Sequence, residues 1–111
     1  MRSMKTSTRT AGATMIVDVV GEIDLSSSPA FRRTLFAALQ ENRRVAINLV
    51  GVRYIDSSAI ASLIEILKEA RRLGTEFVLF GLSPRVHDVL KLTHVLDVFQ
   101  VYETEEQAVK P

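Results

Sequence analysis

Asp56-Ser57-Ser58 is the segment of this sequence whose residue types could do chemistry. The three residues follow an apolar run and precede a pattern typical of an amphipathic helix, so they lie where a helix begins. A helix N-terminus has unpartnered N–H groups and a partial positive charge, which stabilise a capping side chain or an added phosphate. One cap is sufficient, and capping is the ordinary role of such residues. Three capping-type residues in a row leave at least one spare hydroxyl, which a kinase could reach.

Phosphorylation of Ser57 would act mainly on contacts with other proteins. A phosphate adds about −1.5 to −2 charges, and a helix N-terminus favours anions, so the fold should survive the modification. A dianion at the centre of an interface must be paired or desolvated, and it can therefore abolish docking. We hypothesise that Ser57 is a binary switch.

Other chemistries fit this sequence less well. A hydrolase with Ser57 as nucleophile and His87 or His94 as base would normally show Gly-x-Ser-x-Gly, which is missing here. Two histidines without clustered cysteines or carboxylates make a poor metal site, and there is no Gly-rich phosphate loop with lysine. We expect no catalytic residue, metal or cofactor, and hence no enzyme.

The hydrophobic periodicity predicts a single α/β domain, with a mixed β-sheet of four to five strands and about four helices packed against it. We expect no low-complexity segment. Residues 1–12 are expected to form an N-terminal arm or first hairpin strand, and residues 13–111 to form the domain. The expected strands are Met4–Thr10, Ala13–Ile23, Arg44–Val50, Glu76–Gly81 and Val98–Tyr102. Helices are expected from Ser26-Ser27-Ser28-Pro29 to near Asn42, from Asp56 to Gly74, from Ser83-Pro84, and from Thr104, which has capping-box spacing to Gln107. In the second helix, Ile60, Leu63, Ile64, Leu67 and Ala70 form the predicted core stripe.

The bulk composition excludes several functional classes. The chain has 111 residues, 47% of them hydrophobic and 24% charged, with a formal net charge of +1 and no cysteine. Scattered basic residues argue against nucleic-acid binding, and the absence of cysteine excludes disulfides and thiolate metal sites. No apolar run approaches the ~20 residues of a membrane span, and the first ten residues lack the apolar region of a signal peptide. We therefore expect a cytoplasmic protein that is a monomer or weak dimer.

Several motifs in order resemble the STAS domain of bacterial anti-sigma factor antagonists, from about Thr14 to Ala108. They are Gly21-Glu22-Ile23-Asp24, Ile47-Asn48-Leu49 with Tyr54-Ile55-Asp56-Ser57-Ser58, Phe80-Gly81-Leu82-Ser83-Pro84 and Thr104-Glu105-Glu106-Gln107-Ala108. The resemblance implies a STAS-like fold without catalysis of its own. It further implies binding to an anti-sigma factor that is also a serine kinase and holds the ATP, with a phosphoserine phosphatase as a candidate further partner.

The same resemblance implies roles for individual residues. Ser57 would be the phosphoacceptor, Asp56 would shape the turn and help present the hydroxyl, and Ser58 would be a neighbouring contact or cap. Asp24 has turn formation as its ordinary interpretation, whereas the resemblance implies that its loop lies near the serine turn and shares the partner surface. Where the family motif commonly continues Gly-Leu-Gly, this chain has Ala59-Ile60-Ala61, which adds methyl groups where a partner could approach. By the same resemblance we expect Ala59 to be a partner contact.

One alternative function shares this fold. A STAS scaffold, or an accessory subunit of a membrane transport complex without a sigma-factor circuit, would use the serine turn only as a docking edge. Failure of every candidate kinase to modify Ser57 would favour that alternative.

Overall fold

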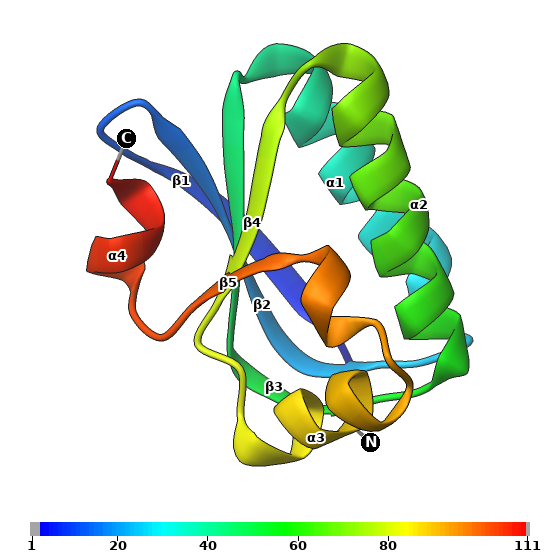
Figure 1. The fold of residues 1–111 in the computed structure, drawn as a ribbon. Coiled ribbons are helices and arrows are strands. Elements are labelled where there is room, and N and C mark those ends of the chain that lie inside the picture. Colours follow the sequence, from blue (N-terminus) through cyan, green and yellow to red (C-terminus); the bar gives the residue numbers. More distant parts are fainter. Residues whose placement is uncertain (1–2, 111) are drawn as a thin grey trace.

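A five-stranded mixed sheet with helices on both faces confirms the predicted α/β architecture (Figure 1). The computed structural model describes residues 3–110; residues 1 and 2 of the predicted arm and residue 111 of the predicted domain lie outside the described residues. The elements are β1 (Lys5–Ala11), β2 (Thr14–Ile23), α1 (Ser28–Glu41), β3 (Arg44–Ile55), α2 (Ser57–Leu73), β4 (Glu76–Phe80), α3 (Pro84–Leu92), a 3₁₀ turn (Leu96–Val98), β5 (Gln100–Tyr102) and α4 (Glu105–Val109). The spatial strand order follows the chain order; β1 pairs antiparallel with β2, and the other pairs are parallel.

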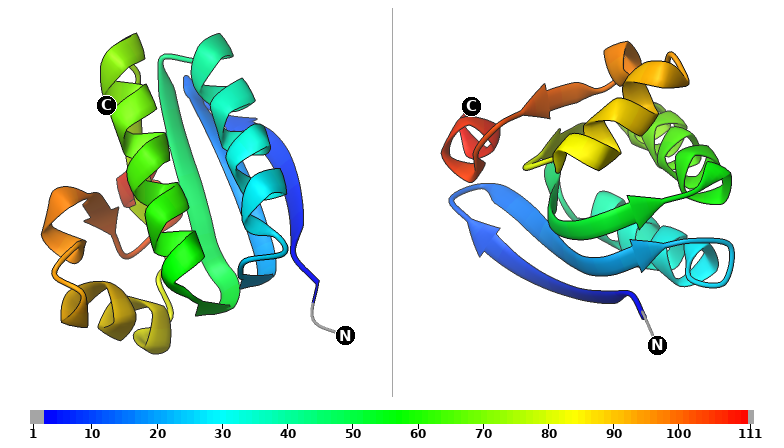
Figure 2. Two further views of the ribbon diagram at one scale, coloured as in Figure 1. Left: turned by 90° about the vertical axis from the view of Figure 1, so that its right-hand side faces the viewer. Right: turned by 90° about the horizontal axis from the view of Figure 1, so that it is seen from below.

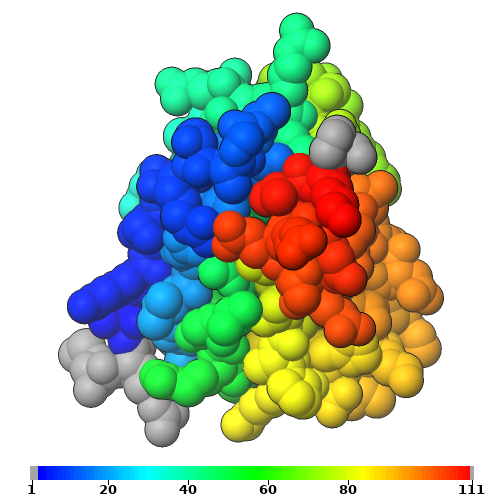
Figure 3. Space-filling model, turned by 90° about the vertical axis from the view of Figure 1, so that its left-hand side faces the viewer, coloured from blue at the N-terminus to red at the C-terminus, as the bar shows by residue number. Residues whose placement is uncertain are grey.

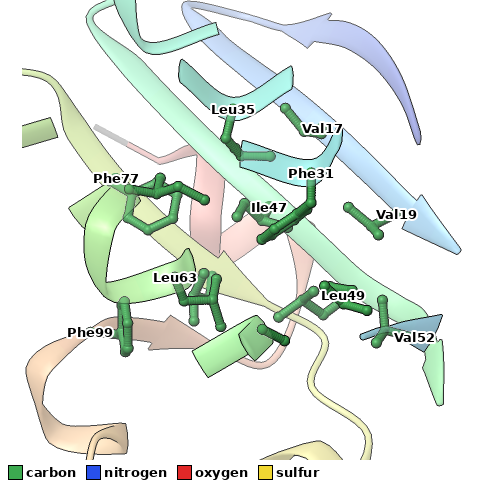
Figure 4. Close-up of a cluster of buried hydrophobic side chains, with 14 of the residues drawn as sticks. Val17, Val19, Phe31, Leu35, Ile47, Leu49, Val52, Leu63, Phe77 and Phe99 are labelled. Carbon is green, nitrogen blue, oxygen red and sulfur yellow. The ribbon is translucent and has the colours of Figure 1, made fainter. Parts of the chain in front are cut away.

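Two hydrophobic clusters hold the layers together. Helices α1 and α2 lie side by side over one face of the sheet (Figure 2). Figure 4 shows Phe31 of α1, Leu63 of α2, and Ile47 and Leu49 of β3 in the same buried cluster. On the opposite face a smaller cluster joins the sheet to Ala108 of α4. Because successive strand residues point to opposite faces, the central strands are apolar on both sides.

Strand β3 is longer than the sequence predicted. We expected a strand over Arg44–Val50 followed by a turn, whereas β3 continues to Ile55. Its pairing with β2 shifts register between Asp18 and Val20 and again between Gly21 and Glu22, so β3 contains two bulges. The bulges keep the second half of β3 paired and place Val52 and Ile55 in the core. As a result the strand runs directly to Asp56.

Two further expectations about helices were wrong in detail. No serine side chain caps α1: Ser27 occupies the N-cap position in helical geometry, and its hydroxyl is bonded within the preceding turn. The buried line of α2 consists of Ala59, Ser62, Leu63, Ile66 and Ala70. Of the predicted stripe, Ile60, Ile64 and Leu67 flank this line and are only partly buried, because α1 contacts one side of α2 and solvent the other.

The remaining helix-end signals agree with the sequence. Ser83 accepts the Val86 N–H, and Thr104 and Gln107 form a reciprocal capping box. Gly74 ends α2 with a left-handed φ of 73°. The last predicted strand is shorter than expected because Leu96–Val98 forms a 3₁₀ turn.

An ionic cluster fastens the C-terminal helix to the N-terminal hairpin. Arg9 of β1 bonds Asp18 of β2 at 2.7 Å and Glu105 of α4 at 2.6 Å, and Figure 3 shows the C-terminal segment lying against the hairpin. These bonds hold the pKa of Glu105 and of Asp18 below their ordinary values.

Among residues 3–110, no helix has both the length and the apolar character needed to cross a membrane.

Candidate functional site

The site is built where two neighbouring parallel strands end. Strand β2 leads into α1 and β3 leads into α2, and both connections lie at the same edge of the sheet (Figure 2). The Asp56 N–H donates to the Ile23 carbonyl at 3.3 Å, which keeps the two strand ends paired at the edge. Parallel strand ends thus bring Asp24 and Asp56, far apart in the sequence, into adjoining loops.

Asp56 is the N-cap of α2 and binds groups on both sides. Its Oδ1 accepts the Ala59 N–H at 3.1 Å and the Ser58 hydroxyl at 2.6 Å, and its Oδ2 accepts the Leu25 N–H at 3.1 Å. Partial desolvation would raise the pKa of this carboxyl, but the hydrogen bonds outweigh that effect and lower the pKa below its ordinary value. One ionised carboxylate therefore fixes both the start of α2 and the β2–α1 loop.

Asp24 forms the turn that the ordinary interpretation of this residue predicts. Its Oδ1 accepts the Ser26 hydroxyl at 2.7 Å, the Ser26 N–H at 3.0 Å and the Ser27 N–H at 3.1 Å. These bonds hold the pKa of the Asp24 carboxyl below its usual range. The turn adjoins the serine segment through Leu25 and Asp56, so turn formation and proximity to the serines are compatible.

The hydroxyl of Ser58 is committed to internal bonds. Besides its bond to Asp56, it lies 3.0 Å from the hydroxyl of Ser28, which is buried at the start of α1. Ser58 therefore links the first turns of the two helices. The sequence alone does not single out Ser28, because a serine among three consecutive serines before a helix suggests only a cap.

Ser57 has the opposite environment. It is the first residue of α2, its side chain is exposed, and its hydroxyl forms no hydrogen bond within residues 3–110. The positive end of the helix dipole lies at this position. Of the two adjacent serines, Ser57 is therefore the one whose hydroxyl is exposed and has no internal hydrogen bond among the described residues.

Ala59 does not belong to the exposed site. Its side chain is fully buried, because the residue lies on the core face of the first turn of α2. We predicted Ala59 as a partner contact, and the structure corrects this: only its N–H takes part, as a donor to Asp56. Of Ala59 and Ala61, Ala61 is the exposed one.

The histidines lie outside this site. His87 belongs to α3, and its Nδ1 is 3.7 Å from Asp88, whereas His94 follows that helix. No hydrogen bond joins either histidine to Ser57 in the part of the chain that is described. Over the same residues, no group of three or more His, Cys, Asp or Glu side chains is arranged to hold a metal ion.

Leu25 is the site residue that sequence reasoning missed. Its side chain is 76% exposed, while its N–H is bound by Asp56. The sequence does contain a signal for an exposed side chain here, because an apolar residue stands between Asp24 and Ser26, two residues that favour a turn.

Comparison with known proteins identifies similar chains. The profile of the STAS domain matches residues 5–108. The anti-sigma-B factor antagonist of Listeria monocytogenes is 31% identical over 88 residues, covering 78% of this chain and 77% of that protein. A solved anti-sigma factor antagonist from Mycobacterium paratuberculosis has a TM-score of 0.88 at 23% identity, covering 96% of this chain and 92% of that chain. The Bacillus cell fate determinant SpoIIAA in its phosphorylated form has a TM-score of 0.70 at 18% identity, covering 95% and 96%. At these identities the two structures establish a common fold.

Proposed function

The chain belongs to the STAS domain family, and on that basis we propose that it is an anti-sigma factor antagonist switched off by phosphorylation at Ser57. Its partner would be an anti-sigma factor with serine kinase activity, and the antagonist would have no catalysis of its own. The proposal places this exchange in the cytoplasm, where it would regulate sigma-factor-dependent transcription. The observation that carries the proposal is the difference between two adjacent serines: the Ser58 hydroxyl is bonded to Asp56, whereas Ser57 is exposed and its hydroxyl has no hydrogen bond to any residue of the described range 3–110.

The start of α2 is suited to receive a phosphate. The Ser57 hydroxyl would attack the γ-phosphorus of the ATP held by the partner, the bond from that phosphorus to the β–γ bridging oxygen would break, and ADP would leave. The hydroxyl proton would pass to a base on the partner. The phosphoserine would then lie at a helix N-terminus, whose partial positive charge favours an anion by about 0.3–1 kcal/mol.

Phosphorylation would act as a switch because the surroundings of Ser57 are fixed. Asp56 already holds the first turn of α2 and the β2–α1 loop, so an added phosphate changes surface charge more than architecture. Asp24, Asp56, Ser57 and Ser58 would form the partner surface, with Asp24 and Ser58 shaping it through their internal bonds. A dianion at the centre of that surface would have to be desolvated on docking, which weakens binding.

A phosphate-transfer assay tests the proposal. The purified protein is incubated with ATP and, in turn, each serine-kinase anti-sigma factor encoded in the same genome, and intact-protein mass spectrometry follows the addition of phosphate. We expect one phosphate, lost in Ser57→Ala and retained in Ser7→Ala, a matched change at an exposed serine of β1. Absence of modification with every such kinase would contradict the proposal and favour a STAS scaffold without a sigma-factor circuit.

A further inference from the structure

Leu25 and Leu92 are the two most exposed leucines of residues 3–110. The side chain of Leu25 is 76% exposed, and that of Leu92 at the end of α3 is 77% exposed. Single exposed apolar side chains are common on protein surfaces, so exposure by itself indicates no function. What distinguishes Leu25 is the backbone that carries it.

The turn around Leu25 is held rigidly by hydrogen bonds at four consecutive N–H groups. The Leu25 N–H donates to Asp56 Oδ2, those of Ser26 and Ser27 donate to Asp24 Oδ1, and that of Ser28 donates to the Asp24 carbonyl at 2.8 Å. A side chain on such a preformed turn loses little additional backbone freedom when a partner covers it. The turn therefore exposes a leucine whose burial by a partner would cost little further backbone entropy.

The same carboxylate connects this leucine to the serine turn. Asp56 Oδ2 holds the Leu25 backbone, while Asp56 Oδ1 holds Ser58 and Ala59 in the helix that begins with Ser57. A protein that brings its ATP to the Ser57 hydroxyl would therefore approach an exposed apolar side chain whose backbone is held by Asp56, the residue next to Ser57.

We infer that Leu25 is an apolar anchor that enters a hydrophobic pocket on the anti-sigma factor kinase, next to the place where that kinase receives Ser57. Asp56 is the positioning residue that sets the spacing between anchor and hydroxyl. This inference rests on the proposed function and assigns Leu25 a part in partner affinity, separate from the transfer chemistry.

The test compares three variants against the kinase that phosphorylates wild-type protein in the transfer assay. Leu25→Ser removes the anchor, Leu25→Met retains an apolar side chain of similar volume, and Leu92→Ser is the control of matched exposure. The Kd of each variant is measured by isothermal titration calorimetry without ATP, and KM and kcat are measured for phosphorylation of Ser57. Circular dichroism checks that each variant folds.

The expected result is a selective loss of affinity. For Leu25→Ser we expect Kd and KM to rise about 10- to 100-fold, since burial of a leucine side chain is lost, with kcat unchanged within about two-fold. Leu25→Met should stay within about five-fold of wild type, and Leu92→Ser should bind like wild type.

Three outcomes would overturn the inference: wild-type affinity for Leu25→Ser, an equal loss for Leu92→Ser, or a fall in kcat with KM unchanged. In each of these the wild-type protein still binds and is still phosphorylated, so the proposed function stands. If no kinase binds or modifies wild-type protein, the proposed function itself fails, and the role of Leu25 fails with it.

Discussion

The hydroxyl of Ser58 donates a hydrogen bond of 2.6 Å to Oδ1 of Asp56. This bond distinguishes two serines that are adjacent in the sequence and equally good capping residues. Ser58 becomes part of the internal structure, together with Ser28, and Ser57 keeps a hydroxyl that faces solvent. A fixed scaffold and a modifiable group thus lie in consecutive positions.

Removing the two hydroxyls should therefore affect stability differently. We expect Ser58→Ala to lower the free energy of unfolding by about 1 kcal/mol, because Asp56 and Ser28 lose a partner. Ser57→Ala should change it by less than about 0.5 kcal/mol. Urea denaturation followed by circular dichroism measures both values, and equal destabilisation by the two variants would show that the Ser57 hydroxyl is also committed.

The charge of Asp56 should make part of the stability depend on pH. Its pKa is lower in the folded protein than in the unfolded chain, so its stabilisation is fully present above the unfolded pKa and is lost as the pH falls through the folded pKa. In Asp56→Asn the amide cannot accept both sets of hydrogen bonds as an anion does, and we expect a loss of about 1–2 kcal/mol near pH 7.

The difference between wild type and Asp56→Asn should shrink as the pH falls below about 4. Urea titrations at a series of pH values measure this difference, which separates Asp56 from the other carboxylates of lowered pKa, Asp18, Asp24, Glu69 and Glu105. A difference that does not vary with pH would rule out a charged cap.

His94 offers a test of backbone strain. It has a left-handed φ of 61° at the end of α3, where the Val95 N–H bonds the Leu90 carbonyl. Glycine adopts this conformation without the cost that a Cβ brings, so His94→Gly should raise the free energy of unfolding by up to about 1 kcal/mol.

The matched change is Gly74→Ala, at a helix end with a φ of 73° and no atom within 4 Å of the new Cβ. It should lower stability by about 1 kcal/mol, because strain is its only structural effect. Thermal denaturation compares the two variants. Destabilisation by His94→Gly would mean that the histidine side chain makes contacts that outweigh the strain.

The Arg9–Glu105 ion pair should contribute modestly to holding α4. Both side chains are partly exposed, at 42% and 40%, so a double-mutant cycle with Arg9→Ala and Glu105→Ala should give a coupling energy of about 0.5–1 kcal/mol at low salt. The coupling should weaken in about 1 M NaCl, where screening is strong. A coupling that is unchanged by salt would indicate packing rather than charge as the main contribution.

Much of the fold could be predicted because its signals are local. The strand over residues 44–50 was visible as an apolar run that is buried on both faces, and the Gly74, Ser83 and Thr104 signals marked helix ends correctly. The second half of β3 was not visible, since Gly51 and Arg53 interrupt the apolar run. Only pairing with β2, through two bulges, keeps that segment extended.

The candidate site was predictable in its residue types and less so in its contacts. Asp56 and the two serines could be recognised from their position before a helix, but the contact that Ser58 makes with Ser28, thirty residues away in the chain, could not. Similarly, the burial of Ala59 and the exposure of Leu25 follow from the packing of α2 and from the bond between Leu25 and Asp56. These are tertiary relationships, and local sequence patterns do not contain them.

The most direct test of the proposed switch is the affinity of the kinase anti-sigma factor for Ser57→Ala and for Ser57→Asp, measured side by side by isothermal titration calorimetry. We predict that Ser57→Ala binds persistently and that Ser57→Asp binds at least about ten-fold more weakly, because a charge at this position must be desolvated in the interface. Equal affinities of the two variants would contradict it.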